Sequence, residues 1–574
     1  MTGMPSAWKN RLHFGDNLKI LRREIPSESI HLIYLDPPFN SNANYNVLFK
    51  EKSGEESAAQ IRAFDDTWTW TTQESAAIFH DLVQDGPKKL SDLLQALRSF
   101  LGTNDMMAYL VMMAGRLIEL HRVLKPEGTL WLHCDPTASH YLKLVLDAVF
   151  TGQRYCNEIV WRRSSAHSDT KQGMRRCGKV HDVIFFYAKS DRFTWNPQFI
   201  PYTKEYLESE YRHVAPDGRR YKETDPTAAK PGGDVEYEWR VKRQLVKGAR
   251  WVADLDGEYQ KPKAGREYKG VRPYDGRFWA YSRANLTQFA LEGHLIHRST
   301  GMPRLVQYAD EMPGIPLQDV WDGIPPASGK EDLGYPTQKP EALLERIVRV
   351  ASNEGDVVLD PFCGCGTAVA AAERLKRRWI GIDVTYLAIN LVQRRLRDNF
   401  GSALTPYEIL GAPTDLKGAE SLAKQDPYQF EWWAVDLVNA RPAKDRKKGA
   451  DSGVDGYVNF FEEHGGNAKR LIVQVKAGHT GVHHVRDLKG TMEREKAVIG
   501  ALITLEAPTK PMLQEAASAG FYTPQHLRGK YPRLQLFTVA ELLEGKRLDF
   551  PQGVNVATFR KAERKTKSEQ QGLY

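Results

Sequence analysis

The sequence has few cysteines and no long apolar run. Five cysteines occur among 574 residues, and no two of them have the C-x-x-C spacing of a zinc site. We interpret them as reduced thiols, which excludes a disulfide-built secreted protein and predicts a cytoplasmic one. No apolar stretch is long enough to span a bilayer, and the N-terminus lacks the apolar segment of a signal peptide. We therefore expect no membrane partner.

What the chain does contain is sufficient for several domains. With 41% apolar and 26% charged residues, it has the composition of a soluble globular protein of about three or four domains. Its net charge of +8 is modest and suggests a polyanionic partner without establishing one. Strand-like and helix-like segments alternate in the N-terminal half and again near residues 340–400. This alternation predicts an α/β fold with a largely parallel sheet.

The strand His31–Leu35 leads directly into Asp36-Pro37-Pro38-Phe39. An apolar strand stopped by two prolines is expected to end at a sheet edge, where open α/β sheets bind their ligands. The Asp36 carboxylate and the Pro37 carbonyl can accept both hydrogens of an NH2 group, and Phe39 can stack on a flat base. Two such acceptors push an exocyclic amine towards a tetrahedral, attacking geometry. The same four residues are also a common way to end a strand, so the motif alone leaves both interpretations open.

Other segments of this half are less specific. A strand from Leu12 ends at Gly15-Asp16-Asn17, where Asp16 either binds a ligand or caps the next helix. We predict that residues 40–100 are irregular, forming a lid over the site or a surface insertion. The other expected helices and strands are Met106–Val123, Thr129–His133, Tyr141–Phe150, Asn157–Trp161 and Val180–Ala188.

Residues 161–330 lose this periodicity and mix prolines, glycines, aromatics and basic residues. A basic segment inserted into a catalytic sheet favours binding of a phosphate backbone, and a solvated surface domain is the alternative. The densest basic positions are Arg175, Arg176, Lys179, Arg219, Arg220, Lys242, Arg243, Lys247 and Arg250, with Trp239, Trp251 and Trp279 among them.

A second strand and turn follow this insertion. The short strand Val357–Leu359 runs into a glycine turn, Asp360 to Thr367, and the next strand ends at Asp383. A glycine turn with an acid at the following strand end is typical of a site for an adenosine ribose. A dinucleotide site would need a third glycine where Val369 stands, so a cofactor with adenosine and no pyrophosphate fits better. No Gly-x-x-x-x-Gly-Lys-Ser/Thr loop occurs, so ATP-driven translocation has no support.

Three of these motifs resemble one family, the β-class amino-methyltransferases of DNA. In that family Asp-Pro-Pro-Phe/Tyr precedes Phe-x-Gly-x-Gly, a target-recognition region lies between them, and Pro-Thr-Gln-Lys-Pro, here Pro336–Pro340, opens the cofactor half. The segment Met106–Trp161 is further similar to the modification subunits of type III restriction systems. The resemblance covers about residues 10–400. It implies a Rossmann-like S-adenosylmethionine-dependent methyltransferase with circularly permuted motif order, acting on double-stranded DNA.

The resemblance also implies roles for single residues. Asp36 and the Pro37 carbonyl hold the target amine, and Phe39 stacks on a base flipped out of the duplex; Pro38 belongs to the same catalytic motif. Among such enzymes this motif accompanies adenine more often than cytosine, so we favour N6-methyladenine. The family often has histidine where Tyr335 stands, and Tyr335 is therefore not assigned. The implied cofactor-binding residues are Asp16, Thr337, Gln338, Lys339, Pro340, Asp360, Phe362, Gly364, Gly366, Thr367 and Asp383.

The composition changes again beyond a linker-like segment at 404–426. An amphipathic helix carries Glu431, a Gly-x-Asp-Gly turn carries Asp455, and Gln474 and Lys476 share one face of a strand. This pattern resembles the Mrr-type branch of the PD-(D/E)xK nucleases and implies an α/β restriction-endonuclease-like domain. By that resemblance Asp455 and the Gln474 oxygen bind Mg²⁺, Lys476 orients or activates water, and Glu431 supplies a second carboxylate. Most of that superfamily has an acid in place of Gln474, which weakens the expected grip on Mg²⁺.

The expected organisation is a catalytic half at 1–160, a target-recognition insertion at 161–330, a cofactor half at 331–403, a linker at 404–426, a nuclease-like domain at 427–553 and a basic tail at 554–574. The first functional hypothesis is an adenine methyltransferase fused to a Mg²⁺-dependent nuclease for restriction and modification. The second is a methyltransferase of adenine N6 or cytosine N4 whose C-terminal domain only binds DNA or a partner. A non-catalytic DNA-binding remnant is the third, and the intact Asp36 and glycine turn argue against it. A dimer is compatible with the sequence but not indicated by it.

Overall fold

The computed structural model describes most of the chain. The described residues are 8–38, 73–164, 175, 177–215, 217–232, 236–239, 252–253, 259–260, 270–298, 300–329, 331–333, 335, 337–443, 453–460, 469–525 and 529–551. They divide into two compact units, one built from segments 1–196 and 318–565, the other mainly from 197–317. Within the described residues, no helix is both long and apolar enough to cross a membrane.

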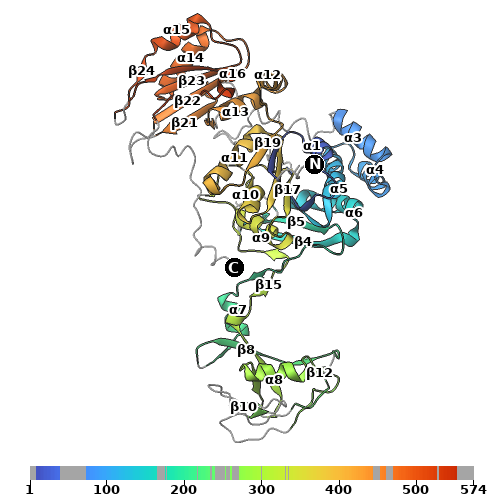
Figure 1. The fold of residues 1–574 in the computed structure, drawn as a ribbon. Coiled ribbons are helices and arrows are strands. Elements are labelled where there is room, and N and C mark those ends of the chain that lie inside the picture. Colours follow the sequence, from blue (N-terminus) through green and yellow to red (C-terminus); the bar gives the residue numbers. More distant parts are fainter. Residues whose placement is uncertain are drawn as a thin grey trace, which may run out of the picture. The chain divides into compact units, whose positions relative to one another are not determined.

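A nine-stranded sheet forms the centre of the first unit, in the order β16-β4-β5-β3-β2-β17-β18-β1-β19 (Figure 1). Neighbouring strands are parallel except β5, which runs antiparallel to both β3 and β4. This arrangement confirms the expected α/β class. The strands are β1 (Asn10–Phe14), β2 (Ile30–Leu35), β3 (Leu124–Cys134), β4 (Tyr155–Arg162), β5 (His181–Ala188), β16 (Val320–Trp321), β17 (Val357–Asp360), β18 (Arg378–Asp383) and β19 (Tyr407–Leu410).

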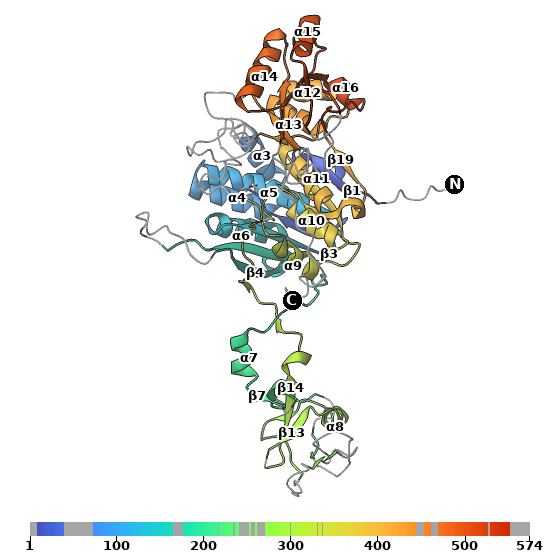
Figure 2. The same cartoon turned by 90° about the vertical axis from the view of Figure 1, so that its left-hand side faces the viewer.

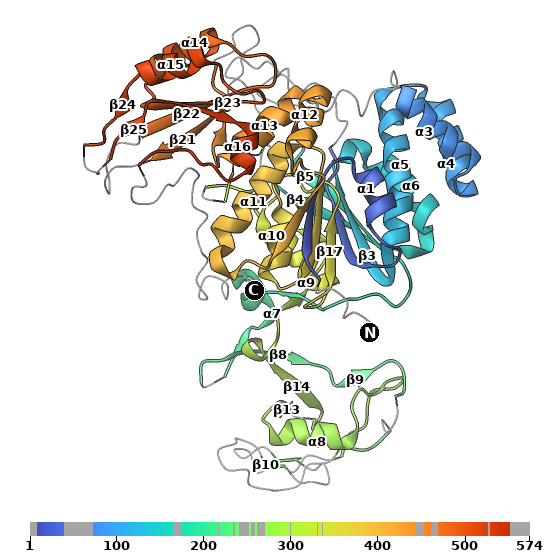
Figure 3. The ribbon, with the colours of Figure 1, turned by 45° about the horizontal axis from the view of Figure 1, so that its top comes forward.

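Helices cover both faces of this sheet, which explains why its central strands are apolar on both sides. Figure 3 shows α1 (Asn17–Glu24), α5 (Asp105–Val123) and α6 (Pro136–Phe150) on one side. On the other side lie α10 (Thr367–Arg374) and α11 (Tyr386–Phe400), with α9 (Glu341–Ala351) packed against α10. The main apolar core lies between the sheet and the first group of helices.

Residues 73–101 correct one expectation, because they are helical and not irregular. They form α3 (Gln73–Gln84) and α4 (Lys88–Leu101), which pack against each other and against α5. In α4 the buried residues Leu90, Leu94 and Leu97 recur at helical spacing, and this stripe joins the main core. Residues 40–72 lie outside the described part of the chain.

The expected linker at 404–426 is also wrong. Tyr407–Leu410 forms β19, which pairs in parallel with β1 and completes one edge of the sheet. Leu416–Gln425 forms α12, which packs against the next helix. A short, half-buried edge strand has only a weak sequence pattern of its own. What makes this segment a strand is its pairing with β1, which lies almost 400 residues away in sequence.

The second unit is smaller than the insertion expected at 161–330. The end of β4, all of β5 and β16 belong to the large sheet, so the boundaries move to 197 and 317. Its core gathers Trp239, Trp279, Leu286 and Leu295 around α8 (Arg283–Leu291), which lies beside β13 (Figure 2). The other elements are β6 (Phe199–Ile200), α7 (Lys204–Glu210), β7 (His213–Val214), β8 (Arg220–Thr224), β9 (Thr227–Ala228), β10 (Val252–Ala253), β11 (Tyr259–Gln260), β12 (Phe278–Trp279), β13 (Leu295–His297), β14 (Pro303–Tyr308) and β15 (Ile315–Pro316).

The C-terminal part of the first unit has its own five-stranded sheet, in the order β20-β21-β22-β23-β26. The first two pairings are antiparallel and the last two parallel. Its sheet packs Ile472, Leu502 and Leu534 against the helices α14 and α15. The elements are α13 (Pro427–Leu437), β20 (Arg441–Pro442), β21 (Gly456–Phe460), β22 (Lys469–Lys476), α14 (Val482–Arg494), β23 (Ile499–Thr504), α15 (Lys510–Ser518), β24 (Phe521–Tyr522), β25 (Tyr531–Pro532), β26 (Leu534–Thr538) and α16 (Val539–Leu543).

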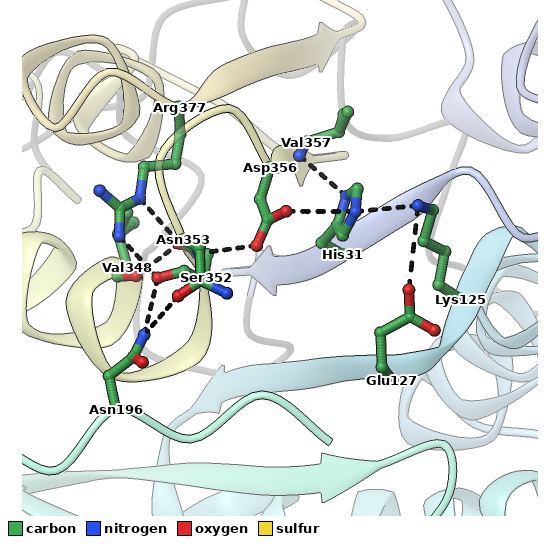
Figure 4. A network of polar contacts seen from close by, with 10 residues as sticks. All are labelled: His31, Lys125, Glu127, Asn196, Val348, Ser352, Asn353, Asp356, Val357 and Arg377. Carbon is green, nitrogen blue, oxygen red and sulfur yellow. Dashed lines mark hydrogen bonds and ion pairs between the residues drawn. The ribbon is translucent and has the colours of Figure 1, made fainter. Parts of the chain in front are cut away.

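A polar network joins the amino-terminal ends of β2 and β17 (Figure 4). His31 Nε2 lies 3.2 Å from Asp356 Oδ1, and the Val357 N–H donates to His31 Nδ1 at 3.0 Å. At the end of α9, Asn196 Nδ2 donates to the carbonyls of Arg349 (3.0 Å) and Ser352 (2.9 Å). These carbonyls lack partners within the helix, so Asn196 satisfies them and fixes the chain just before the second unit begins.

Candidate active site

The carboxyl ends of adjacent parallel strands place the sequence motifs side by side. Asp36 follows β2, Asp360 ends β17 and Asp383 ends β18, and these three strands are neighbours in the sheet. Phe14 at the end of β1 pairs with Asp383, so Gly15 and Asp16 lie at the same edge. Strand order, and not proximity in sequence, therefore builds this site.

Asp36 forms an ion pair with Lys339. Lys339 Nζ lies 2.5 Å from Asp36 Oδ2, and the two side chains are only 11% and 16% exposed. Pro37 is buried and Pro38 half-buried, as expected for a rigid turn at the sheet edge. Phe39 lies outside the described residues. The acid of the first motif is thus held by the lysine of the motif that opens the cofactor half.

The glycine turn is held to Asp383 by backbone donors. The Gly364 N–H donates to Asp383 Oδ2, while the Thr385 N–H and hydroxyl both donate to Asp383 Oδ1, each at 2.9 Å. Gly366 caps α10 with φ +75°, and a Cβ on it would lie 2.8 Å from Val392. Only glycine fits there, because both the backbone angle and the space exclude a side chain. The turn is a cradle shaped by backbone groups.

This edge of the sheet is electronegative and enclosed. Burial raises the pKa of the Asp360 carboxyl well above its usual value, and the neighbouring Asp36 and Asp383 add to the effect. Asp360 Oδ1 accepts the Phe362 N–H at 3.1 Å. Burial likewise raises the pKa of Asp383. A cationic ligand would offset these crowded acids, and a sulfonium is such a cation.

Several residues at this edge were not predicted from sequence. The Tyr335 ring lies against the glycine turn, since a Cβ on Gly364 would come within 3.1 Å of it. Asn17 Nδ2 donates to the Pro361 carbonyl at 2.7 Å, and Arg116 Nε donates to Asn17 Oδ1 at 2.5 Å. The position of Tyr335, directly before the Pro-Thr-Gln-Lys-Pro motif, was the one available signal.

A buried polar chain also lies behind Asp36. The Tyr34 hydroxyl is 3.1 Å from His133 Nδ1, and His133 Nε2 is 3.2 Å from Asp182 Oδ2. Burial alone would raise the pKa of Asp182, but the hydrogen bond with His133, together with Lys339 and Arg163, holds it below its usual value. In the sequence, the signal for these polar contacts was a histidine and an aspartate, His133 and Asp182, inside otherwise apolar strands.

Some predicted cofactor residues are engaged elsewhere. Asp16 caps α1 through the Lys19 N–H at 2.9 Å, and its other oxygen pairs with Arg116 at 2.8 Å. Gln338 braces its own loop by donating to the Glu331 carbonyl at 2.7 Å. The Thr367 hydroxyl accepts from Arg395 at 2.9 Å. Thr337 is exposed, and Pro340 directly precedes α9. Their cofactor roles stay predictions.

The second predicted site lies in the C-terminal part. The Val475 N–H donates to Asp455 Oδ2 at 2.7 Å, which brings Asp455 against the strand of Gln474 and Lys476. Gln474 is 5% exposed, and its Oε1 has no hydrogen-bond partner among the described residues. Glu431 is half-buried on α13, which packs against β22. Among the described residues, no group of three or more His, Cys, Asp or Glu side chains is placed to hold a metal.

The basic positions differ in their surroundings. Arg219 is held by the carboxylates of Asp310 and Glu311, so its charge is already compensated. Lys179 donates to the Thr137 hydroxyl at 3.1 Å, and Arg175 is exposed. Arg220 Nη1 donates to the Tyr211 carbonyl at 3.4 Å. Trp239 and Trp279 are buried core residues. Outside the described residues lie Arg176, Lys242, Arg243, Lys247, Arg250 and Trp251.

Comparison with known proteins agrees with this geometry. Residues 30–394, more than half of the chain, match the model of the DNA methylase family whose members act at N6 or N4. The chain therefore belongs to the DNA methylase family. Residues 429–544 match a second family, described as NACHT-associated inactive restriction endonuclease 1.

Individual relatives include the type II methyltransferase M.EcaI of Enterobacter cloacae, 28% identical over 67% of this chain and 69% of the relative. The Mod subunit of the type III enzyme StyLTI of Salmonella typhimurium is 27% identical over 63% of this chain, which spans about half (49%) of that relative. The DNA adenine methyltransferase YhdJ of Escherichia coli is 52% identical over 168 residues, 27% of this chain and 52% of the relative. A Thermus thermophilus DNA modification methylase, solved with S-adenosylmethionine, is 16% identical over 70% of this chain and 99% of its own, with a TM-score of 0.32.

Proposed function

We propose that the chain transfers a methyl group from S-adenosylmethionine to N6 of adenine in double-stranded DNA, as the modification activity of a restriction–modification system in the cytoplasm. The observation that carries this proposal is the meeting of Asp36 with the glycine turn and Asp383 at adjacent strand ends. The similarity to a DNA adenine methyltransferase over 168 residues supports adenine over cytosine.

The residues present fit this cofactor. The turn at Gly364 and Gly366 presents backbone groups and no side chain to the methionine end. Asp383 Oδ2, which accepts the Gly364 N–H, can accept a ribose hydroxyl as well. When bound, S-adenosylmethionine supplies an already activated methyl group. Asp36 and the Pro37 carbonyl then accept the two amine hydrogens of a flipped adenine and orient its nitrogen for in-line attack. The acids at this edge offset the positive charge of the sulfonium.

The base is identified by digesting DNA treated with the wild-type protein and S-adenosylmethionine to nucleosides. Mass spectrometry is expected to detect N6-methyladenine, and Asp36→Ala provides the inactive control. Methyl groups found on cytosine N4 would move the enzyme to the other branch of its family. Methyl groups on cytosine C5 would contradict the mechanism, because Asp36 acts on an exocyclic amine.

A second candidate activity is Mg²⁺-dependent DNA cleavage by the C-terminal part. The observation that favours it is the buried oxygen Oε1 of Gln474, which has no hydrogen-bond partner among the described residues, since such an oxygen needs a donor or a cation. Asp455 lies against the same strand through its bond to the Val475 N–H. Asp455 and Gln474 would hold the ion and Lys476 would orient water, with Glu431 on α13 as the further carboxylate. Mg²⁺ would supply positive charge at the scissile phosphate. The matching family is described as inactive, so the alternative is a domain that only binds DNA or a partner.

Cleavage is tested with methylated and unmethylated plasmid, purified protein, and Mg²⁺ or Mn²⁺ without ATP. Nicking that EDTA abolishes and Lys476→Ala removes, with methylation retained, is the expected result. Lys469 lies at the opposite end of the same strand and is not part of this set, so Lys469→Ala is the matched control. If neither plasmid is cut, the C-terminal part is a binding module.

A further inference from the structure

Lys339 of the Pro-Thr-Gln-Lys-Pro motif directly contacts Asp36 of the Asp-Pro-Pro-Phe motif. Lys339 and Asp36 are separated by 303 residues, yet Nζ and Oδ2 are 2.5 Å apart. Exposed ion pairs contribute little, but both of these side chains are largely buried. Removing one partner of such a pair leaves the other charge buried without compensation, and that charge is then no longer held by its partner.

The backbone around Lys339 is fixed on both sides. On one side, Gln338 Nε2 donates to the Glu331 carbonyl at 2.7 Å and its Oε1 accepts the Leu333 N–H at 3.0 Å. On the other side, Pro340 is buried and directly precedes α9, whose helix packs against α10. The backbone of Lys339 is therefore held in place, and its ammonium contacts Asp36, which is followed by the rigid prolines Pro37 and Pro38.

Lys339 also lies within electrostatic reach of two further acids. Its charge opposes the effect of burial on the pKa of both Asp182 and Asp360. Asp36 and Asp360 lie at the ends of neighbouring strands, where the charge on Asp36 adds to the effect of burial and disfavours a second negative charge on Asp360. The Lys339 ammonium is the cation paired with Asp36 at this edge.

We propose that Lys339 is a positioning residue for methyl transfer, which holds the Asp36 carboxylate by Oδ2 and leaves Oδ1 for the target amine. A carboxylate has about four lone-pair sites on its two oxygens, so it can bind the ammonium and the amine together. This inference rests on the proposed function. Under this proposal Lys339 acts on Asp36 and not on the cofactor. Loss of the Lys339 ammonium is then expected to slow methyl transfer without weakening cofactor binding.

The test compares Lys339→Met, Lys339→Arg and Lys376→Ala in the full chain. Methionine keeps most of the side-chain volume, arginine keeps the charge, and Lys376 is an exposed control paired with Glu354. We expect the single-turnover rate of total methyl incorporation into DNA to fall about 10- to 100-fold in Lys339→Met, since small misplacements of reacting groups cost rates of that order. Lys339→Arg should regain part of the rate, and Lys376→Ala should match the wild type.

Calorimetry of S-adenosylmethionine binding separates the alternatives. Unchanged cofactor affinity in Lys339→Met, with the rate reduced, supports the proposal. If cofactor affinity falls in parallel with the rate, Lys339 contributes to cofactor binding and the proposal is overturned. An unchanged or increased rate also overturns it, the increase showing that Lys339 blocks Asp36. If Lys339→Met does not fold, Lys339→Gln takes its place as the uncharged variant. The proposal is then overturned if Lys339→Arg is no more active than Lys339→Gln. A wild-type protein that transfers no methyl group to any base refutes the proposed function itself.

Discussion

At the scale of single residues, Asp383 joins the cofactor loop to the strand that follows it. Its two oxygens accept hydrogen bonds from the N–H groups of Gly364 and Thr385. Asp383 therefore holds the glycine turn in shape, in addition to its proposed role in binding the cofactor ribose. Asp383→Ala should weaken S-adenosylmethionine binding by about 10- to 100-fold, because unpaired buried donors cost about 1–3 kcal/mol. Calorimetry on a variant with wild-type circular dichroism measures this. An unchanged affinity would remove Asp383 from the cofactor site.

A buried histidine in the second unit predicts a pH dependence. His297 Nε2 accepts the Trp239 N–H at 2.9 Å, and burial lowers its pKa from 6.5 to about 3. Below pH 6.5 the unfolded chain takes up a proton that the folded chain does not, so stability falls as the pH drops towards 3. The slope for one such group is at most about 1.4 kcal/mol per pH unit.

His297→Gln keeps an acceptor but cannot titrate in this range. We expect its loss of stability between pH 6.5 and pH 5 to be smaller than that of the wild type. Hydrogen exchange of peptides from residues 270–310, corrected for intrinsic rates, reports the stability of this unit. Equal pH slopes in the two proteins would mean that His297 does not control the acid sensitivity of the unit.

Sequence motifs predicted the acids at the strand ends but not their partners. Asp36, Asp360 and Asp383 were located because each follows an apolar run. The pair of His133 with Asp182 was missed, because it depends on β3 and β5 being antiparallel neighbours. The resemblance implied a cofactor role for Lys339, which stays a prediction, and the sequence did not show its ion pair with Asp36.

At the scale of elements, the start of α10 depends on Gly366. The glycine has φ +75°, and an added Cβ would lie 2.8 Å from Val392 on α11. Gly366→Ala should cost about 1–3 kcal/mol for the backbone angle, with an added packing penalty. Gly355→Ala is a matched control, since Gly355 has φ +83° in open space within the same half.

Urea denaturation of both variants checks this difference. Gly366→Ala is expected to lose more stability than Gly355→Ala and to bind S-adenosylmethionine more weakly. Equal losses would show that the backbone angle alone matters and that Val392 adjusts without cost.

The expected elements of the sheet were largely correct, because apolar strands and amphipathic helices carry local signals. Two segments failed for different reasons. The helix α4 has an apolar stripe at helical spacing, but the prediction of an irregular segment before it extended through residue 100. The edge strand β19 has four half-buried residues, and only its pairing with β1 makes it a strand.

At the scale of the whole molecule, we expect DNA to bind basic residues whose charge is not already compensated by a carboxylate. Replacing Arg175 and Lys179 with alanine should weaken DNA binding and reduce the slope of its salt dependence, by about 0.9 for each phosphate that is no longer neutralised. Arg219→Gln should leave the slope unchanged, because Asp310 and Glu311 already hold that guanidinium. Binding measured across a salt series distinguishes the two. If only Arg219→Gln alters the slope, the DNA-binding surface lies on the other unit.

The central claim is that Asp36 acts on the DNA amine while a neighbouring part of the same sheet edge binds the methyl donor. Measuring both functions in Asp36→Ala tests this most directly, by calorimetry with S-adenosylmethionine and by tritiated-methyl incorporation into DNA. We predict that cofactor affinity is retained and that methyl transfer falls by at least about 100-fold, because the amine loses the group that orients it. Substantial transfer by Asp36→Ala, or a parallel loss of cofactor binding, would contradict the account.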